Sequence, residues 1–69
     1  MYTFEAKYYD SKANKTRTIT IEFEEQYMEN IADAWQYAAR RASHSYLPDG
    51  TEIALPRHME LLSLKFISV

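Results

Sequence analysis

The stretch ADAWQYAARRASHSYLPDG, residues 32–50, decides the fold. Its apolar side chains recur with the 3.6-residue period of an amphipathic helix. The sequence Pro48-Asp49-Gly50 ends this pattern, because proline disfavours helical geometry in the residue before it and Asp-Gly suits a turn. Since the same period extends back towards Glu24, we predict a helix over residues 25–46.

The predicted helix has an apolar stripe, which consists of Met28, Ile31, Trp35, Ala38 and Ala42, flanked by Tyr27, Ala34, Ala39 and Tyr46. Basic side chains gather in its last turns, where they complement the helix macrodipole. The small alanines allow the helix to approach a sheet closely. We therefore predict that Trp35 fills the core between Phe4, Ile21 and a last strand.

Three other segments alternate with the two-residue period of half-buried strands. Residues 2–9 and 16–23 are separated by the polar stretch DSKANK, so they predict a hairpin. The third segment covers residues 59–69. Its pattern predicts an inner row of Leu62, Leu64 and Phe66 and an outer row of Leu61, Ser63, Lys65 and Ile67.

These elements predict one α+β domain over residues 1–69, a ββαβ two-layer sandwich. One helix packs on a three-stranded antiparallel sheet. A four-stranded sheet is the alternative, in which an extended piece at residues 51–55 joins the other strands.

Composition excludes several classes of protein. Eight basic residues against ten acidic ones give a net charge of -2, which is not the balance of a basic nucleic-acid binder. The single glycine excludes glycine-rich phosphate loops, and the absence of cysteine excludes disulfides and thiolate metal ligands. The N-terminus has no basic, apolar leader pattern, and no stretch approaches the roughly 20 apolar residues of a membrane span. We expect a soluble cytoplasmic protein that does not contact a membrane.

Candidate catalytic and metal-binding residues are few. His44 and His58 flank the turn with three carboxylates nearby in sequence, a ligand set suited to zinc or manganese, but their spacing matches no metal motif. Ser43 and Ser45 beside His44 lack the sequence context of a nucleophile. We therefore expect no enzyme, no catalytic residue, no metal and no cofactor.

Protein binding is the function that the surface residues favour. If Phe4, Ile21 and Leu64 face the helix, the other sheet face carries threonines and apolar side chains, and the last strand ends without a residue that blocks edge pairing. Self-association through the sheet face or edge, giving a homodimer, is the first candidate, a target protein is the second, and isolated surface hydrophobes are the alternative. The predicted partner-binding residues are Tyr37, Arg40, Arg41 and His44 on the helix and Tyr9, Leu61 and Ile67 on the sheet.

A nucleic-acid-binding regulator is the alternative function. It requires a basic patch at the helix end, next to the aromatic ring of Tyr37, composed of Arg40, Arg41, Arg57, His58 and Lys65. In the competing interpretation, Arg41 pairs with Tyr37 and Asp33 while Arg40 is solvated. The excess of acidic residues favours the second interpretation.

The helix ADAWQYAARRA, the segment LPDGTEIALP and a last strand together are similar to small ββαβ proteins of bacteriophages and mobile elements. Residues 30–60 also resemble HicB-type antitoxins, whose helix precedes a D-G-x-x-I-P-like segment. The matching positions are Asp49, Gly50, Ile53 and Pro56, with two residues inserted. The chain departs from that family by lacking a Pro-Gly segment before the helix, a further strand and a DNA-binding tail. The resemblance implies a non-enzymatic inhibitor or regulator that binds a host protein, and it implies no particular site residues.

Overall fold

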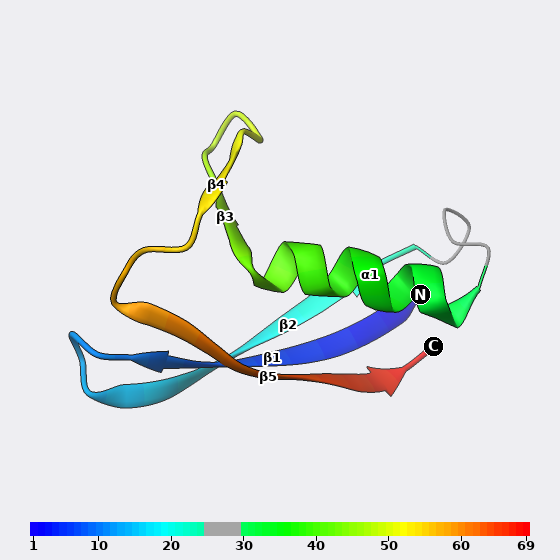
Figure 1. Ribbon diagram of the computed structural model, residues 1–69. Coiled ribbons are helices and arrows are strands. Elements are labelled where there is room, and N and C mark those ends of the chain that lie inside the picture. Colours follow the sequence, from blue (N-terminus) through cyan, green and yellow to red (C-terminus); the bar gives the residue numbers. More distant parts are fainter. Residues whose placement is uncertain (25–29) are drawn as a thin grey trace.

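The computed structural model describes residues 1–24 and 30–69, in which one helix packs on an antiparallel sheet (Figure 1). The elements are β1 (Tyr2–Asp10), β2 (Lys15–Phe23), α1 (Ile31–Ala42), β3 (His44–Tyr46), β4 (Glu52–Ala54) and β5 (Met59–Ser68). The main sheet has the order β2-β1-β5, while β3 and β4 form a separate two-stranded ribbon. The predicted α+β fold is confirmed. No helix of the described residues is long and apolar enough to cross a membrane.

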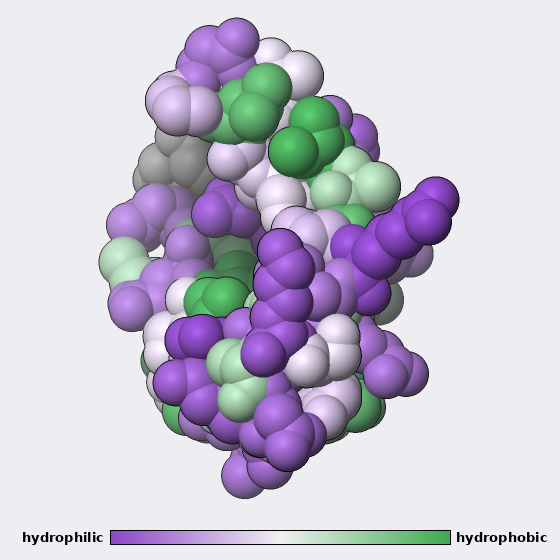
Figure 2. Space-filling view, turned by 90° about the vertical axis from the view of Figure 1, so that its left-hand side faces the viewer, coloured by the Kyte–Doolittle hydropathy of each residue, from purple (hydrophilic) through white to green (hydrophobic). Residues whose placement is uncertain are grey.

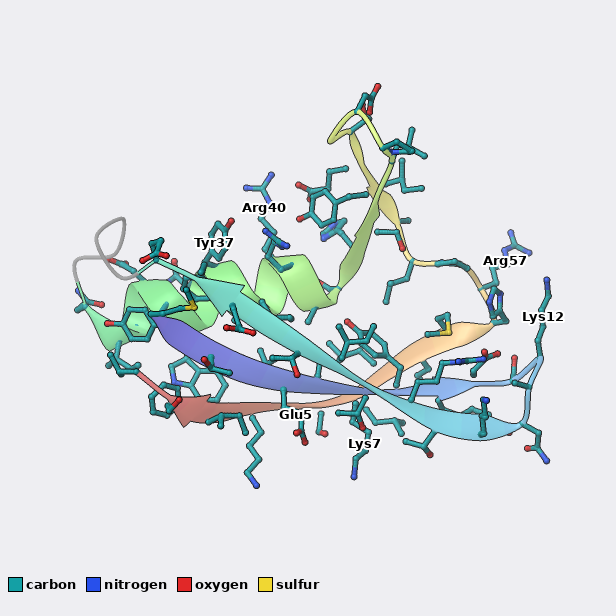
Figure 3. The ribbon with its side chains drawn as sticks, turned by 180° about the vertical axis from the view of Figure 1, so that it is seen from behind. Glu5, Lys7, Lys12, Tyr37, Arg40 and Arg57 are labelled. Carbon is teal, nitrogen blue, oxygen red and sulfur yellow. The ribbon has the colours of Figure 1, made fainter. Side chains whose placement is uncertain are left out.

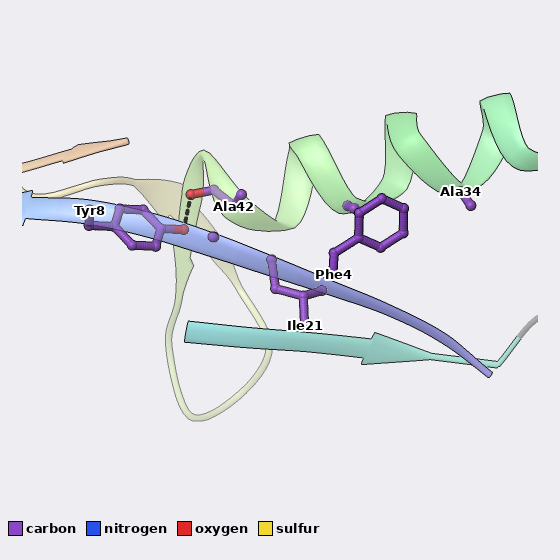
Figure 4. Packing of buried hydrophobic residues seen from close by; sticks show 7 residues of the cluster. Phe4, Tyr8, Ile21, Ala34 and Ala42 are labelled. Atoms are coloured by element: carbon purple, nitrogen blue, oxygen red, sulfur yellow. Dashed lines mark hydrogen bonds between the residues drawn. The ribbon is translucent and has the colours of Figure 1, made fainter. Parts of the chain in front are cut away.

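The core lies between the central strand β1 and α1 (Figure 4). Alternate residues of β1, namely Phe4, Ala6 and Tyr8, are buried, as their two-residue period predicts. On α1 the buried residues are alanines spaced by four, which lie in one row along the helix. Their small side chains allow the helix to pack closely on the strand. The Tyr8 hydroxyl donates a hydrogen bond to the carbonyl of Ala42 and so satisfies one backbone group at the helix end.

The buried row of α1 consists of Ala34, Ala38 and Ala42, so the prediction of a buried Trp35 is wrong. Trp35 is 38% exposed and lies beside this row, where its indole contacts the Phe4 ring edge-on with 4.9 Å between the ring centroids. An indole is too large for the narrow space that the alanines leave between helix and strand. It therefore seals the side of the core.

The helix is shorter at its C-terminal end than the predicted range 25–46. It ends at Ala42: the backbone N–H of Ser43 makes the last helical bond, to the carbonyl of Ala39, and the Ser43 hydroxyl bonds to the same oxygen. The next residues form β3, which pairs with β4 across the turn at Gly50, where φ is +90°. The extended piece predicted at residues 51–55 thus joins this ribbon and not the main sheet. Residues 25–29, including Tyr27 and Met28, lie outside the described residues.

Two β-bulges in β5 change which of its residues face the helix. Tyr8 pairs with Leu61 while Lys7 pairs with Ser63, so Leu62 is an extra residue, and a second shift makes Ile67 another. Leu61 consequently packs against the core, whereas Leu62 is 50% exposed. The predicted placement of these two leucines is wrong, because a two-residue period cannot register an inserted residue. Leu64 and Phe66 do pack against the core, as predicted.

The outer face of the sheet is mainly polar. The register places Thr18, Lys7 and Ser63 side by side across the three strands, with Thr20, Glu5 and Lys65 in the next row. Glu5 and Lys7 point away from the helix in Figure 3. Of the apolar residues predicted on this face, Leu61 is wrong, because it packs against the core, whereas Ile67 and Val69 are exposed.

The turn between β1 and β2 is organised by the carboxylate of Asp10, whose residue is only 6% exposed. One oxygen accepts the backbone N–H groups of Lys12 and Ala13, at 3.0 and 3.2 Å, and the other accepts Nε of Arg17 at 2.9 Å. These bonds favour the charged form. The hydrogen bond from Arg17 is the largest cause that holds the pKa of Asp10 below its ordinary value of 3.8.

We expect Asp10→Asn to destabilise the protein at neutral pH and to have little effect in acid. A lowered folded-state pKa stabilises the fold above the unfolded-state pKa, and this contribution disappears as the pH falls through the folded-state value. Urea denaturation of both proteins from pH 7 to pH 2 measures the difference. A difference that stays constant with pH would show that the charge of Asp10 contributes nothing.

Candidate protein-binding surface

The helix covers only part of the inner face of the sheet. With 12 residues, α1 is about 18 Å long, whereas nine residues of β2 span about 30 Å. Beyond the end of α1, the ribbon of β3 and β4 rises away from the sheet (Figure 1). A hollow of about 640 Å³ remains between them, and Figure 2 shows it below the ribbon with hydrophobic side chains inside.

The hollow has a floor from the sheet and walls from the helix end, the ribbon and the segment before β5. The lining residues are Tyr8, Ile19, Thr20, Ile21, Glu22, Arg41, His44, Ser45, Tyr46, Leu55, Pro56 and Met59. Ile19 is on the inner face of β2 opposite Ala6, yet it is 47% exposed and lines the hollow.

Arg41 is the cation at the wall of the hollow. Its Nη1 donates to the hydroxyl of Tyr37 at 3.2 Å, and its guanidinium lies 5.8 and 5.4 Å from the ring centroids of Tyr37 and Tyr46. The two rings hold the cation by contacts that leave its charge unneutralised. Within residues 1–24 and 30–69, no carboxylate forms an ion pair with Arg41.

Arg40 and His44, in contrast, both contact one carboxylate. Nη2 of Arg40 lies 3.1 Å from Oε2 of Glu52, and Nε2 of His44 lies 3.4 Å from Oε1. The hydrogen bond from Arg40 is the largest cause that lowers the pKa of Glu52. Because Arg40 is exposed, these contacts add little stability, but they connect the ribbon to the helix end.

The Ser43–His44 pair has no nucleophile–base geometry. Oγ of Ser43 donates to the carbonyl of Ala39 at 2.7 Å, so its hydrogen is already used. Nδ1 of His44 lies 3.0 Å from the carbonyl of Arg40 but 3.5 Å from Oγ of Ser43, which exceeds the reach of a nucleophile–base hydrogen bond. Both side chains cap the helix end. Among the described residues, no three His, Asp or Glu side chains gather as a metal site would require.

The structure brings the four helix residues of the predicted partner-binding set to one region and separates the three sheet residues from it. Tyr37, Arg40, Arg41 and His44 lie on the last turns of α1 and the start of β3. Tyr9 instead lies at the far end of β1, where its hydroxyl bonds to Asn14. Leu61 packs against the core, and Ile67 lies at the second bulge.

Sequence reasoning missed Ile19, Tyr46 and Leu55 as surface candidates. Their alternation and apolarity match core residues, so the missing signal was the length of the helix relative to the strands. A helix extending to residue 46 would cover the region that the hollow occupies. Because the predicted helix ends four residues too late, the sequence does not predict the hollow.

The basic residues predicted to form one patch are spread apart. Arg57 lies at the end of the sheet away from Arg40 (Figure 3). Arg40 is paired with Glu52, and Lys65 lies opposite Glu5 on the outer face. The predicted contact of Arg41 with Tyr37 is confirmed, but the predicted pairing of Arg41 with Asp33 is wrong, because no described carboxylate forms an ion pair with Arg41. Arg40 is ion-paired with Glu52 and not merely solvated.

No protein-family model matches the chain, and no curated protein and no solved structure matches it at a significant level.

Proposed function

We propose that the protein is a small non-enzymatic binding module that inhibits or regulates a partner protein by contacting it through the hollow. The observation that carries this proposal is the hollow over the part of the inner sheet face beyond the helix, with the exposed Ile19 at its floor and Arg41 beside two tyrosine rings at its wall. Tyrosine and arginine are the residue types that most often dominate binding energy at protein interfaces.

The lining defines the chemistry of the partner. At the floor of the hollow, the partner would place apolar side chains, which would remove Ile19 from water. The wall needs an acidic side chain, because Arg41 is held in place by aromatic rings and lacks a carboxylate partner among the described residues. A protruding apolar segment that carries an Asp or Glu meets both requirements.

The expected result of replacing both Arg41 and Tyr46 by alanine is a loss of partner affinity of more than about tenfold, because hot-spot truncations cost about 2 kcal/mol or more. A tagged protein captures partners from a bacterial lysate, mass spectrometry identifies them, and calorimetry with the purified partner measures the affinity. Far-UV circular dichroism should be unchanged, since both side chains lie outside the core.

The matched control replaces Glu5 and Lys7, on the outer face, by alanine. This variant should retain the affinity of the wild type. Equal affinity of the hollow variant and the wild type would refute the proposal. Recovery of nucleic acid alone, released by nuclease and by salt, would support the alternative function as a nucleic-acid-binding regulator.

A further inference from the structure

Exposed cations gather at the end of the sheet that α1 does not reach. In the register of the sheet, Arg17 lies opposite the buried Tyr8, and Lys15 is two residues earlier in β2, so both side chains lie on the inner face. Lys12 and Arg57 also point to the helix side of the sheet in Figure 3. These exposed residues, namely Lys12, Lys15, Arg17 and Arg57, form the basic end.

Two segments that are distant in the sequence meet at the basic end. The backbone N–H and the hydroxyl of Ser11 donate to the carbonyl of His58, at 2.9 and 3.3 Å. Lys12 and Arg57 are the sequence neighbours of these two residues. The turn after β1 and the segment before β5 therefore bring both cations to the same end of the sheet.

Little negative charge balances the basic end. Asp10, on the inner face, already accepts hydrogen bonds from Arg17 and from the backbone of the turn. Glu60 lies on the outer face, as its place in the register shows. Within residues 1–24 and 30–69, the other three cations of the basic end form no ion pair. Although the whole chain has a net charge of -2, this end is positive and attracts anions.

The basic end is continuous with the hollow. Ile19, at the floor of the hollow, is two residues from Arg17 on the same face of β2. Residues 55–59 line the hollow in part and also carry Arg57. An extended segment that leaves the hollow along β2 covers about 13 Å between Ile19 and Lys15, the length of about four residues. Over this distance the surface changes from apolar to cationic.

We infer that the partner protein carries an acidic segment, which lies along the basic end, directly beside the apolar side chains that fill the hollow. This inference rests on the proposed function, because it specifies the partner of the same surface. A nucleic acid fits the basic end less well. Single strands bind where exposed aromatic rings alternate with cations, and Tyr8, the ring opposite Arg17, is 3% exposed.

Fluorescence anisotropy with synthetic peptides tests this inference without the natural partner. The labelled probes contain two leucines and four glutamates, with the leucines at one end or at the other. Control probes carry glutamine in place of glutamate. The glutamate probes should bind more tightly than the glutamine probes. This difference should shrink when the salt concentration rises from about 0.05 to about 0.5 M, because dissolved ions screen exposed charges.

Two matched variants locate the binding. Lys12→Gln with Lys15→Gln should lower the affinity for the glutamate probes about fivefold at low salt. Lys7→Gln with Lys65→Gln removes the same charge from the outer face and should retain the affinity of the wild type. Equal affinities of the two variants would overturn the inference. So would equal binding of glutamate and glutamine probes, or no binding of the glutamate probes.

A labelled single-stranded DNA is the competing probe. Tighter binding of this DNA than of the peptides, lost in the variant with Lys12→Gln and Lys15→Gln, would assign the basic end to nucleic acid and overturn the inference. The purified partner separates this inference from the proposed function. If replacement of Arg41 and Tyr46 weakens its binding but replacement of Lys12 and Lys15 does not, the hollow remains the binding surface and the acidic segment is excluded.

Discussion

Replacement of Phe4 by alanine is expected to lower the free energy of unfolding by about 3–5 kcal/mol, the usual cost of removing a fully buried phenylalanine. Phe4 is 0% exposed, and its ring contacts those of Phe23, Trp35 and Phe66 with centroid separations of 5.8, 4.9 and 5.4 Å. These three rings come from β2, α1 and β5, so Phe4 connects every major element to the central strand.

The effect should be large relative to the whole stability of the protein. The free energy of unfolding of a small domain is about 5 kcal/mol. The other buried residues include four alanines, whose side chains are too small to fill the space left by the lost ring. We therefore expect the Phe4→Ala variant to be largely unfolded near room temperature. Far-UV circular dichroism and urea denaturation measure both the residual structure and the loss.

Leu62→Ala is the control for that experiment. Leu62 is also a large apolar residue of the sheet, but it lies at a bulge and is half exposed, so its truncation should change the free energy by no more than about 0.5 kcal/mol. A Phe4→Ala variant as stable as Leu62→Ala would contradict the placement of the core around the ring of Phe4.

The sequence predicts the fold well where the period of the side chains is unbroken. Residues Phe4, Ala6 and Tyr8 alternate with polar residues, and the structure buries them in that order. The period fails at Leu62, because the extra residue is specified by pairing with another strand and not by local pattern. The pairing register of two strands depends on both of them, so it cannot be predicted from the sequence of one strand alone.

The sequence predicts one part of the candidate site, the contact between Tyr37 and Arg41, but not the hollow beside it. Tyr37 and Arg41 are four residues apart on one helix, and their contact follows from helical geometry alone. The hollow depends on where that helix stops, and Ser43 can continue a helix or cap it with similar ease. Its hydroxyl bonds to Ala39, and the residues after it have strand partners across the turn. Tertiary pairing thus decides a boundary that propensity leaves open.

Introducing a leucine at Ala38 is the second large effect we expect, with a loss of about 1–3 kcal/mol from overpacking. Ala38 is 0% exposed and lies in the middle of the row by which α1 contacts the sheet. Leucine and alanine are both strong helix formers, so helix propensity would not account for a loss. The additional carbons must instead push α1 away from β1, which would also strain the hydrogen bond from Tyr8 to Ala42.

Ala39→Leu makes the same chemical change one residue later, on the exposed side of α1. It should alter the free energy of unfolding by no more than about 0.5 kcal/mol. The difference between the two variants, measured by urea denaturation, isolates the contact between helix and strand. Equal stabilities would mean that the helix and sheet are not closely packed at Ala38. Because the hollow begins where this contact ends, a displaced helix would also move Arg41 relative to Ile19, so Ala38→Leu should weaken partner binding even in the fraction of molecules that remains folded.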